Sequence, residues 1–190
     1  EGNPVTTIRE RTFENCVSLT SITIPDSVTT ICHSAFFNCR SLTSITIPDG
    51  VTNIEYSAFY RCWSLTSVTI GNGVTSIGNN AFNNCISLTS ITIPASVISI
   101  GYGVFRDCTG LTSIGIGNGV ISIGDYTFYR CASLTSITFQ GGAPTVDSNT
   151  FLGVADGAVA LVTIDDQASF GDLGTDWNGL TVDPILTYTT

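Results

Sequence analysis

Six of the seven cysteines recur at one fixed spacing, so thiol chemistry is the first to consider. They stand 23 residues apart, at Cys16, Cys39, Cys62, Cys85, Cys108 and Cys131. If residues one period apart are vertical neighbours in layers about 4.8 Å apart, their Cβ atoms lie beyond the usual ~3.5–4.5 Å of a disulfide. Metal binding would need unpaired thiolates in a dry core. The spacing therefore predicts reduced, buried thiols that fill a narrow slot.

The other polar residues give little support for catalysis. His33 is the only histidine, and the residues in its 23-residue column vary as expected of a solvent-facing position. Cys32 lies outside the cysteine column and is expected near the surface. The segment "GNGVTSIG" recurs as "GNGVISIG" with no helix after it, which indicates a turn rather than a phosphate-binding loop. We predict no catalytic residue, no cofactor and no metal.

Hydroxyl side chains form two rows that repeat with the same period. The pairs are Ser21/Thr23, Ser44/Thr46, Ser67/Thr69, Ser90/Thr92 and Ser136/Thr138, with Gly115 breaking one row. These rows are consistent with a solvated strand face of good β propensity. The alternative is a periodic surface that recognises a repetitive ligand, such as a glycan or an ice plane.

Greater variety lies in the positions around each cysteine, where aromatic residues and arginines gather. Such residues are the usual anchors of interfaces, and they predict a partner on the turn-bearing edge of the molecule. The candidate partner-binding residues are Phe37, Tyr56, Tyr60, Trp63, Tyr102, Arg106, Tyr126 and Tyr129. The alternative is that these aromatic rings only lean on neighbouring layers.

A repeat of 23 residues must position all of these side chains. The segment "LTSITI" predicts a strand with Ile22 and Ile24 on one side. Turns such as "PDG" and "GNG" follow, and "VTTI" predicts a second, short strand. "SAFFNC" predicts a single α or 3-10 turn that buries Phe36 and Cys39. One such unit cannot bury enough surface alone, so the repeats must stack.

The phenylalanine column shows that the period never slips. It runs through Phe13, Phe36, Phe59, Phe82, Phe105, Phe128 and Phe151. We therefore predict a mainly β repeat solenoid over residues 1–164, with about six to seven rungs and a partial first rung. The open edge of that first rung could allow end-to-end self-association. The chain lacks a starting methionine, which suggests a processed product or a piece of a longer protein.

The C-terminal segment differs in pattern and in charge. The net charge is −9; residues 1–139 contribute eight acids and six arginines, and residues 140–190 contribute seven aspartates and no base. We predict an acidic cap over residues 165–190, with Trp177, Leu180 and Ile185 covering the last rung. The alternative is a calcium site at Asp165, Asp166, Asp172 and Asp176, but their spacing matches no EF-hand loop.

The repeated phrase "L-T-S-I-T-I-P-x-x-V-T-x-I-x-x-x-A-F-x-x-C" resembles the 23-residue leucine-rich repeats of the BspA-like family. The resemblance covers residues from about Val5 to Val162. It implies a right-handed solenoid of parallel strands with short helical or 3-10 turns on the opposite side. It also implies a group of bacterial and protist surface proteins associated with adhesion and with protein or host-matrix binding.

The predicted function is a non-catalytic binding or adhesion module, secreted or on a cell surface, with a protein or glycan partner. The alternative is a structural segment of a self-assembling surface filament or array. The acidic balance argues against nucleic acid, whose binding depends on neutralised phosphates. No apolar run approaches the roughly 20 residues of a membrane span.

Overall fold

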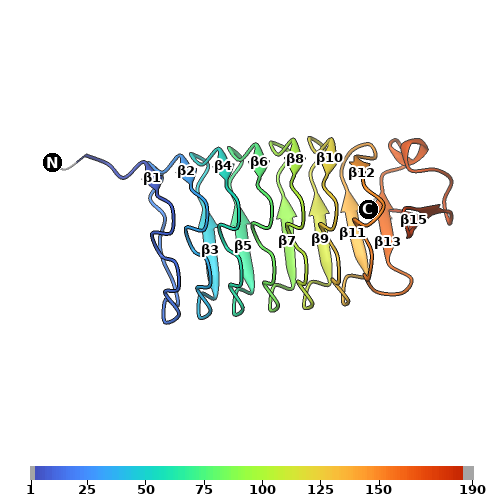
Figure 1. Ribbon diagram of the computed structural model, residues 1–190. Coiled ribbons are helices and arrows are strands. Elements are labelled where there is room, and N and C mark those ends of the chain that lie inside the picture. Colours follow the sequence, from blue (N-terminus) through green and yellow to red (C-terminus); the bar gives the residue numbers. More distant parts are fainter. Residues whose placement is uncertain (1–2, 186–190) are drawn as a thin grey trace, which may run out of the picture.

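The chain forms a coil of stacked parallel strands. The computed structural model describes residues 3–185, which form a β-solenoid of about eight turns (Figure 1). Each turn is here called a rung; rungs 2 to 7 each contain a short strand, a turn segment, a long strand and a second turn, whereas rung 1 has only the short strand. We number the rungs by their phenylalanines, from Phe13 in rung 1 to Phe151 in rung 7. The predicted mainly β repeat solenoid is confirmed.

The long strands form one face of the coil. Neighbours pair in parallel and in 23-residue register, as in Ile45 with Val68. The isoleucines point inward and are buried, whereas the hydroxyl residues between them face outward, because side chains alternate along a strand. These strands are β3 (Ser44–Ile47), β5 (Ser67–Ile70), β7 (Ser90–Ile93), β9 (Ser113–Ile116), β11 (Ser136–Phe139) and β13 (Val159–Val162).

The short strands form a second sheet in strictly consecutive order. Each has two residues, and in six of the seven the second is a buried isoleucine. They are β1 (Thr7–Ile8), β2 (Thr30–Ile31), β4 (Asn53–Ile54), β6 (Ser76–Ile77), β8 (Ser99–Ile100), β10 (Ser122–Ile123) and β12 (Thr145–Val146).

A continuous stack of phenylalanine rings lies in the core. Neighbouring ring centroids are 5.0–5.8 Å apart, and the planes lie within 10° of parallel. The rings from Phe36 to Phe128 are fully buried. Residues one period apart are therefore vertical neighbours, as the fixed spacing predicts.

The segments around each phenylalanine and cysteine form successive turns rather than the predicted helical turn. In rung 2, Ser34 and Asn38 have positive φ values of 55° and 61°, which interrupt a right-handed helix. Their N–H groups, like that of Phe36, donate to the next rung, at distances of 2.7–2.9 Å. Within residues 3–185 the only helix is the 3-10 helix η1 (Gln167–Ser169).

The long-strand sheet is interrupted between rungs 3 and 4. β5 pairs only with β3, and β7 pairs only with β9. The turn after β7 contains Pro94, which has no N–H to donate to the rung below, and Ser96. At the equivalent glycines the rungs approach so closely that a Cβ on Gly73 or Gly119 would lie 1.8 or 1.9 Å from a carbonyl oxygen. Ser96 carries a Cβ at this position, and β5 and β7 do not pair, although the short strands β4 and β6 of the same two rungs do.

The last part of the described chain continues the stack. β15 (Leu180–Pro184) pairs in parallel with β13, and β14 (Asp176–Trp177) pairs with β15 in the antiparallel direction. The Trp177 ring packs 5.7 Å from Phe151, Leu180 is buried, and the Ile185 N–H donates to Val162. β15 therefore extends the coil beyond residue 164. The division into a solenoid over residues 1–164 and an acidic cap over residues 165–190 stays a prediction.

At the other end, rung 1 is only partly covered. Phe13 stacks on Phe36 but is half-buried, and Cys16 is exposed. The prediction of buried thiols is therefore wrong for Cys16, because no rung lies on its outer side within residues 3–185. Self-association through this rung remains a prediction.

Candidate functional site

A groove runs along the turn-bearing face, parallel to the axis of the coil. Its volume is about 630 Å³. Its floor is a column of residues with positive φ, and this column is small in rungs 2 to 5: Ser34, Ser57, Asn80 and Gly103. In rungs 1 and 6 the same column holds the large residues Arg11 and Tyr126. The small residues of this column are therefore flanked by a large residue at each end.

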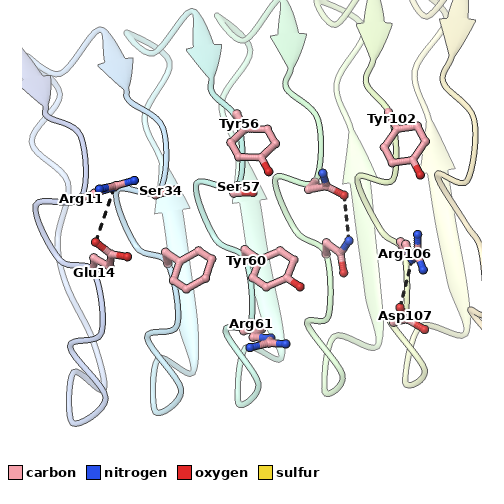
Figure 2. Close-up of a pocket in the computed structure, with 13 residues that line it drawn as sticks. Arg11, Glu14, Ser34, Tyr56, Ser57, Tyr60, Arg61, Tyr102, Arg106 and Asp107 are labelled. Atoms are coloured by element: carbon pink, nitrogen blue, oxygen red, sulfur yellow. Dashed lines mark hydrogen bonds and ion pairs between the residues drawn. The ribbon is translucent and has the colours of Figure 1, made fainter.

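Tyrosines line the groove on the rungs before and after rung 4. Figure 2 shows Tyr56 and Tyr60 on rung 3, with Tyr102 and Arg106 two rungs farther along. Tyr56 is 55% exposed and Tyr102 is 39% exposed, so both rings present accessible surface. Tyr60 stacks on Phe37 with ring centroids 5.1 Å apart. The hydroxyls of these tyrosines make no hydrogen bond within residues 3–185, which leaves them available to a ligand.

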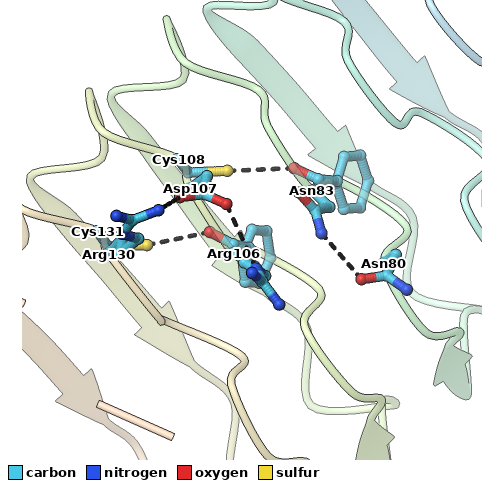
Figure 3. A network of polar contacts seen from close by, with 9 residues as sticks. Asn80, Asn83, Arg106, Asp107, Cys108, Arg130 and Cys131 are labelled. Atoms are coloured by element: carbon cyan, nitrogen blue, oxygen red, sulfur yellow. Dashed lines mark hydrogen bonds and ion pairs between the residues drawn. The ribbon is translucent and has the colours of Figure 1, made fainter. Parts of the chain in front are cut away.

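Rung 4 has amides where its neighbours have aromatic rings or arginine. The Asn83 Nδ2 group donates to Asn80 Oδ1 at 2.9 Å, as Figure 3 shows. Asn83 is only 7% exposed, and its side chain makes no other hydrogen bond within the described part of the chain. The floor of the groove thus carries amide groups whose hydrogen-bonding capacity is only partly used.

Most charges at the groove are paired, and one cation is not. Arg11 lies 3.8 Å from Glu14, and Arg106 lies 3.3 Å from Asp107. Arg61 makes no ion pair within residues 3–185, and its guanidinium lies over the Tyr60 ring at 5.3 Å. Arg61 therefore offers guanidinium donors that no carboxylate in the described part of the chain engages.

The structure brings together five of the eight predicted partner-binding residues. The groove is lined by Phe37, Tyr56, Tyr60, Tyr102 and Arg106. Tyr126 and Tyr129 lie beside its closed end, where the Arg106 guanidinium is 5.0 Å from the Tyr129 ring and Tyr126 packs edge-on against Tyr102. The alternative of aromatic rings leaning on neighbouring rungs describes part of these contacts. A role of the eight residues in binding remains a prediction.

Trp63 lies apart from the groove. The Arg40 guanidinium covers its ring at 4.2 Å, and its Nε1 group donates to Asn84 Oδ1 at 3.1 Å. The Trp63 side chain is therefore held by residues of the two adjacent rungs. The groove floor, in contrast, was not singled out from the sequence. Its signal is the column of small residues between Arg11 and Tyr126.

The cysteine column forms a ladder of weak hydrogen bonds. Each thiol of rungs 2 to 6 donates to the carbonyl oxygen of the phenylalanine in the preceding rung, at 3.0–3.3 Å; Figure 3 shows those of Cys108 and Cys131. All seven cysteines are free. Burial raises the pKa of Cys39 to about 11 and raises the pKa values of Cys62, Cys85 and Cys131 as well. These protonated thiols serve packing rather than reaction.

His33 and Cys32 are both half-buried, although each was expected near the surface. The His33 Nε2 atom contacts Glu10 Oε1, and its backbone N–H donates to Glu55 at 2.9 Å. Cys32 is half-buried, and burial is the main cause of its raised pKa. His33 makes no hydrogen bond to a serine or cysteine nucleophile within the described residues.

No group of three or more histidine, cysteine, aspartate or glutamate side chains in residues 3–185 could hold a metal ion. The calcium alternative for the C-terminal aspartates therefore has no structural support. Over the same residues, no helix is long and apolar enough to span a membrane.

The repeat can now be compared with known proteins. The model of the BspA type leucine rich repeat region matches six copies, over residues 6–108 and 75–157. The chain belongs to this family. None of the curated proteins matches it.

Solved structures of this repeat class show the same coil. A leucine rich repeat protein of T. pallidum is 35% identical, with a TM-score of 0.69 over 73% of this chain and 68% of that one. The pneumococcal vaccine antigen PcpA is 19% identical, with a TM-score of 0.72 over 90% of this chain and 42% of that one. A Bacteroides ovatus leucine-rich repeat protein is 24% identical, with a TM-score of 0.54 over 97% and 56%. The chain thus spans about half the length of the latter two proteins.

Proposed function

We propose that the chain is a non-catalytic binding module of a secreted or cell-surface protein, and that it recognises a protein or glycan partner through the groove. The observation that carries this proposal is the pair of exposed rings, Tyr56 and Tyr102, on either side of the hydrogen-bonded pair of half-buried Asn80 and buried Asn83. Aromatic side chains beside partly used polar groups are typical of binding sites. Membership of the BspA-type family supports a surface location and a role in protein interaction.

The absence of a reaction is part of the proposal. The single histidine contacts a carboxylate, and the cysteines of rungs 2 to 6 are buried with their thiols turned toward backbone carbonyls. A nucleophile would need an adjacent base or a lowered pKa. Burial instead raises the thiol pKa values, which supports a scaffold rather than an enzyme.

Binding to an array of immobilised glycans and matrix proteins tests this proposal. A Tyr56→Ala/Tyr102→Ala double variant should lose binding to the ligands that the unmodified chain retains. A Thr46→Ala/Thr69→Ala variant on the strand face, which keeps the groove intact, should bind normally. The proposal fails if the groove variant binds as well as the unmodified chain, or if only the strand-face variant loses binding.

A further inference from the structure

The shape of the groove fits a linear chain that lies along the coil axis. The floor is open across rungs 2 to 5 and is bounded by Arg11 and Tyr126. With rungs about 4.8 Å apart, the open length is roughly 15–20 Å. A polyproline II chain rises about 3.1 Å per residue, so about five or six residues fill this length.

The backbone of the floor offers no place for an added β-strand. The N–H groups of Ser34, Ser57 and Asn80 already donate to carbonyl oxygens of the next rung, at 2.9, 3.0 and 2.8 Å. Strand addition needs a row of free backbone donors and acceptors. The groove must therefore recognise a ligand through side chains. The backbone of that ligand cannot form a ladder of hydrogen bonds with the backbone of the floor.

The groove offers several unused hydrogen-bond donors. The hydroxyls of Tyr56, Tyr60 and Tyr102 make no hydrogen bond within residues 3–185, and the Arg61 guanidinium makes no ion pair there; the carboxylates of Glu14 and Asp107 each face an arginine. Proline residues contribute carbonyl acceptors and no N–H. The carbonyl groups of a proline-rich segment can therefore accept from these donors, and its prolines have no N–H group that needs a partner.

The spacing of the tyrosines matches the period of that conformation. Stacked ring distances of 5.1 Å from rung 3 to rung 4 and 5.7 Å from rung 4 to rung 5 put Tyr56 and Tyr102 roughly 10–11 Å apart along the axis. In polyproline II, residues three apart are separated by about 9.3 Å and point the same way. Two prolines in a P-x-x-P pattern can then pack on the two rings, with rung 4 between them.

We propose that the groove binds a proline-rich peptide segment in the polyproline II conformation, with prolines on Tyr56 and Tyr102. The Asn80 amide, the Arg61 guanidinium and the tyrosyl hydroxyls donate to its carbonyl oxygens. This inference rests on the proposed function and names the partner class for the same site. Aromatic-lined grooves recognise such preformed segments in other folds.

Fluorescence anisotropy with the whole 190-residue chain tests the inference. The probe is fluorescein-labelled decaproline, and the control is a labelled decamer of alternating glycine and serine. We expect saturable binding of decaproline and at least tenfold weaker binding of the control decamer. Tyr102→Ala should weaken decaproline binding at least tenfold, equivalent to about 1.4 kcal/mol. Ile121→Ala, at a site that is 65% exposed and outside the groove lining, should leave it unchanged.

Further arms separate the contributions and the alternatives. Tyr56→Phe keeps the ring and removes the hydroxyl, so it should weaken binding less than Tyr56→Ala does. Equal affinity for the two decamers overturns the inference, and so does unchanged affinity in Tyr102→Ala with a native circular dichroism spectrum. If decaproline fails while a neutral hexasaccharide of glucose binds in a Tyr102-dependent way, the inference fails and the proposed function stands. If neither decaproline nor any arrayed ligand depends on the groove, both fail.

Discussion

Truncating one ring of the phenylalanine stack should cost more in the middle of the coil than at its end. Phe82 is fully buried between Phe59 and Phe105, with ring centroids 5.1 and 5.7 Å away. Phe→Ala changes in cores cost about 3–5 kcal/mol, and an aromatic pair adds about 0.5–1.5 kcal/mol beyond its burial. Because two ring pairs are lost, we expect Phe82→Ala to fall at the upper end of the core range and to lower the free energy of unfolding by about 4–5 kcal/mol.

Phe13→Ala is the matched control. Phe13 is half-buried and stacks on a single ring, that of Phe36, at 5.0 Å. With one neighbour and less buried surface, its truncation should cost about half as much, roughly 2 kcal/mol. Urea unfolding followed by circular dichroism measures both changes. Equal losses in the two variants would refute nearest-neighbour stacking as the source of stability.

Three further predictions concern the glycines and the thiols. Gly119→Ala should destabilise strongly because its Cβ would lie 1.9 Å from Ala95 O, whereas Gly115→Ala, with 3.5 Å to the nearest atom, should be neutral or stabilising; thermal melting compares them. At pH 8 a thiol reagent should modify exposed Cys16 rapidly and the five buried cysteines only after unfolding, and rapid modification of all seven would contradict the ladder. The free energy of unfolding should fall above about pH 9, because the pKa of Cys39 rises from an ordinary 9.0 to about 11 on folding. If the free energy of unfolding of Cys39→Ala depends on pH as steeply as that of the unmodified chain, Cys39 does not contribute to this fall.

The stacking could be predicted from the sequence because one period fixes it. The phenylalanine column keeps its register without insertion, and the alternation of Ile45 and Thr46 shows which side of the strand faces inward. The buried cysteines follow from the same argument. Only Cys16 departs from it, since its position at the exposed end of the coil depends on what covers it and not on its own repeat.

The interruption between rungs 3 and 4 could not be predicted in the same way. It coincides with a change in the turn, where rung 3 has Gly73 and rung 4 has Ser96. The turn conformation was also missed, because the N–H of Ser34 donates to a different rung and not to its own. Both features involve distances between rungs, which a single repeat does not reveal.

The candidate site was predictable by residue type and not by arrangement. The tyrosines and Arg106 were identified from their variable columns, but the groove depends on the small floor residues Ser34 and Asn80. Tryptophan is a common interface anchor, yet Arg40 covers the ring of Trp63. Side-chain direction therefore decides which members of the aromatic set can reach a common ligand.

Nuclear Overhauser effects between phenylalanine rings test the central claim most directly. In a sample with labelled phenylalanine, ring protons of Phe82 should show cross-peaks to Phe59 and to Phe105, whose centroids are 5.1 and 5.7 Å away. No cross-peak should join Phe59 directly to Phe105. A ring-to-ring pattern that skips a period, or the absence of contacts between rings 23 residues apart, would contradict the stacked coil on which the groove depends.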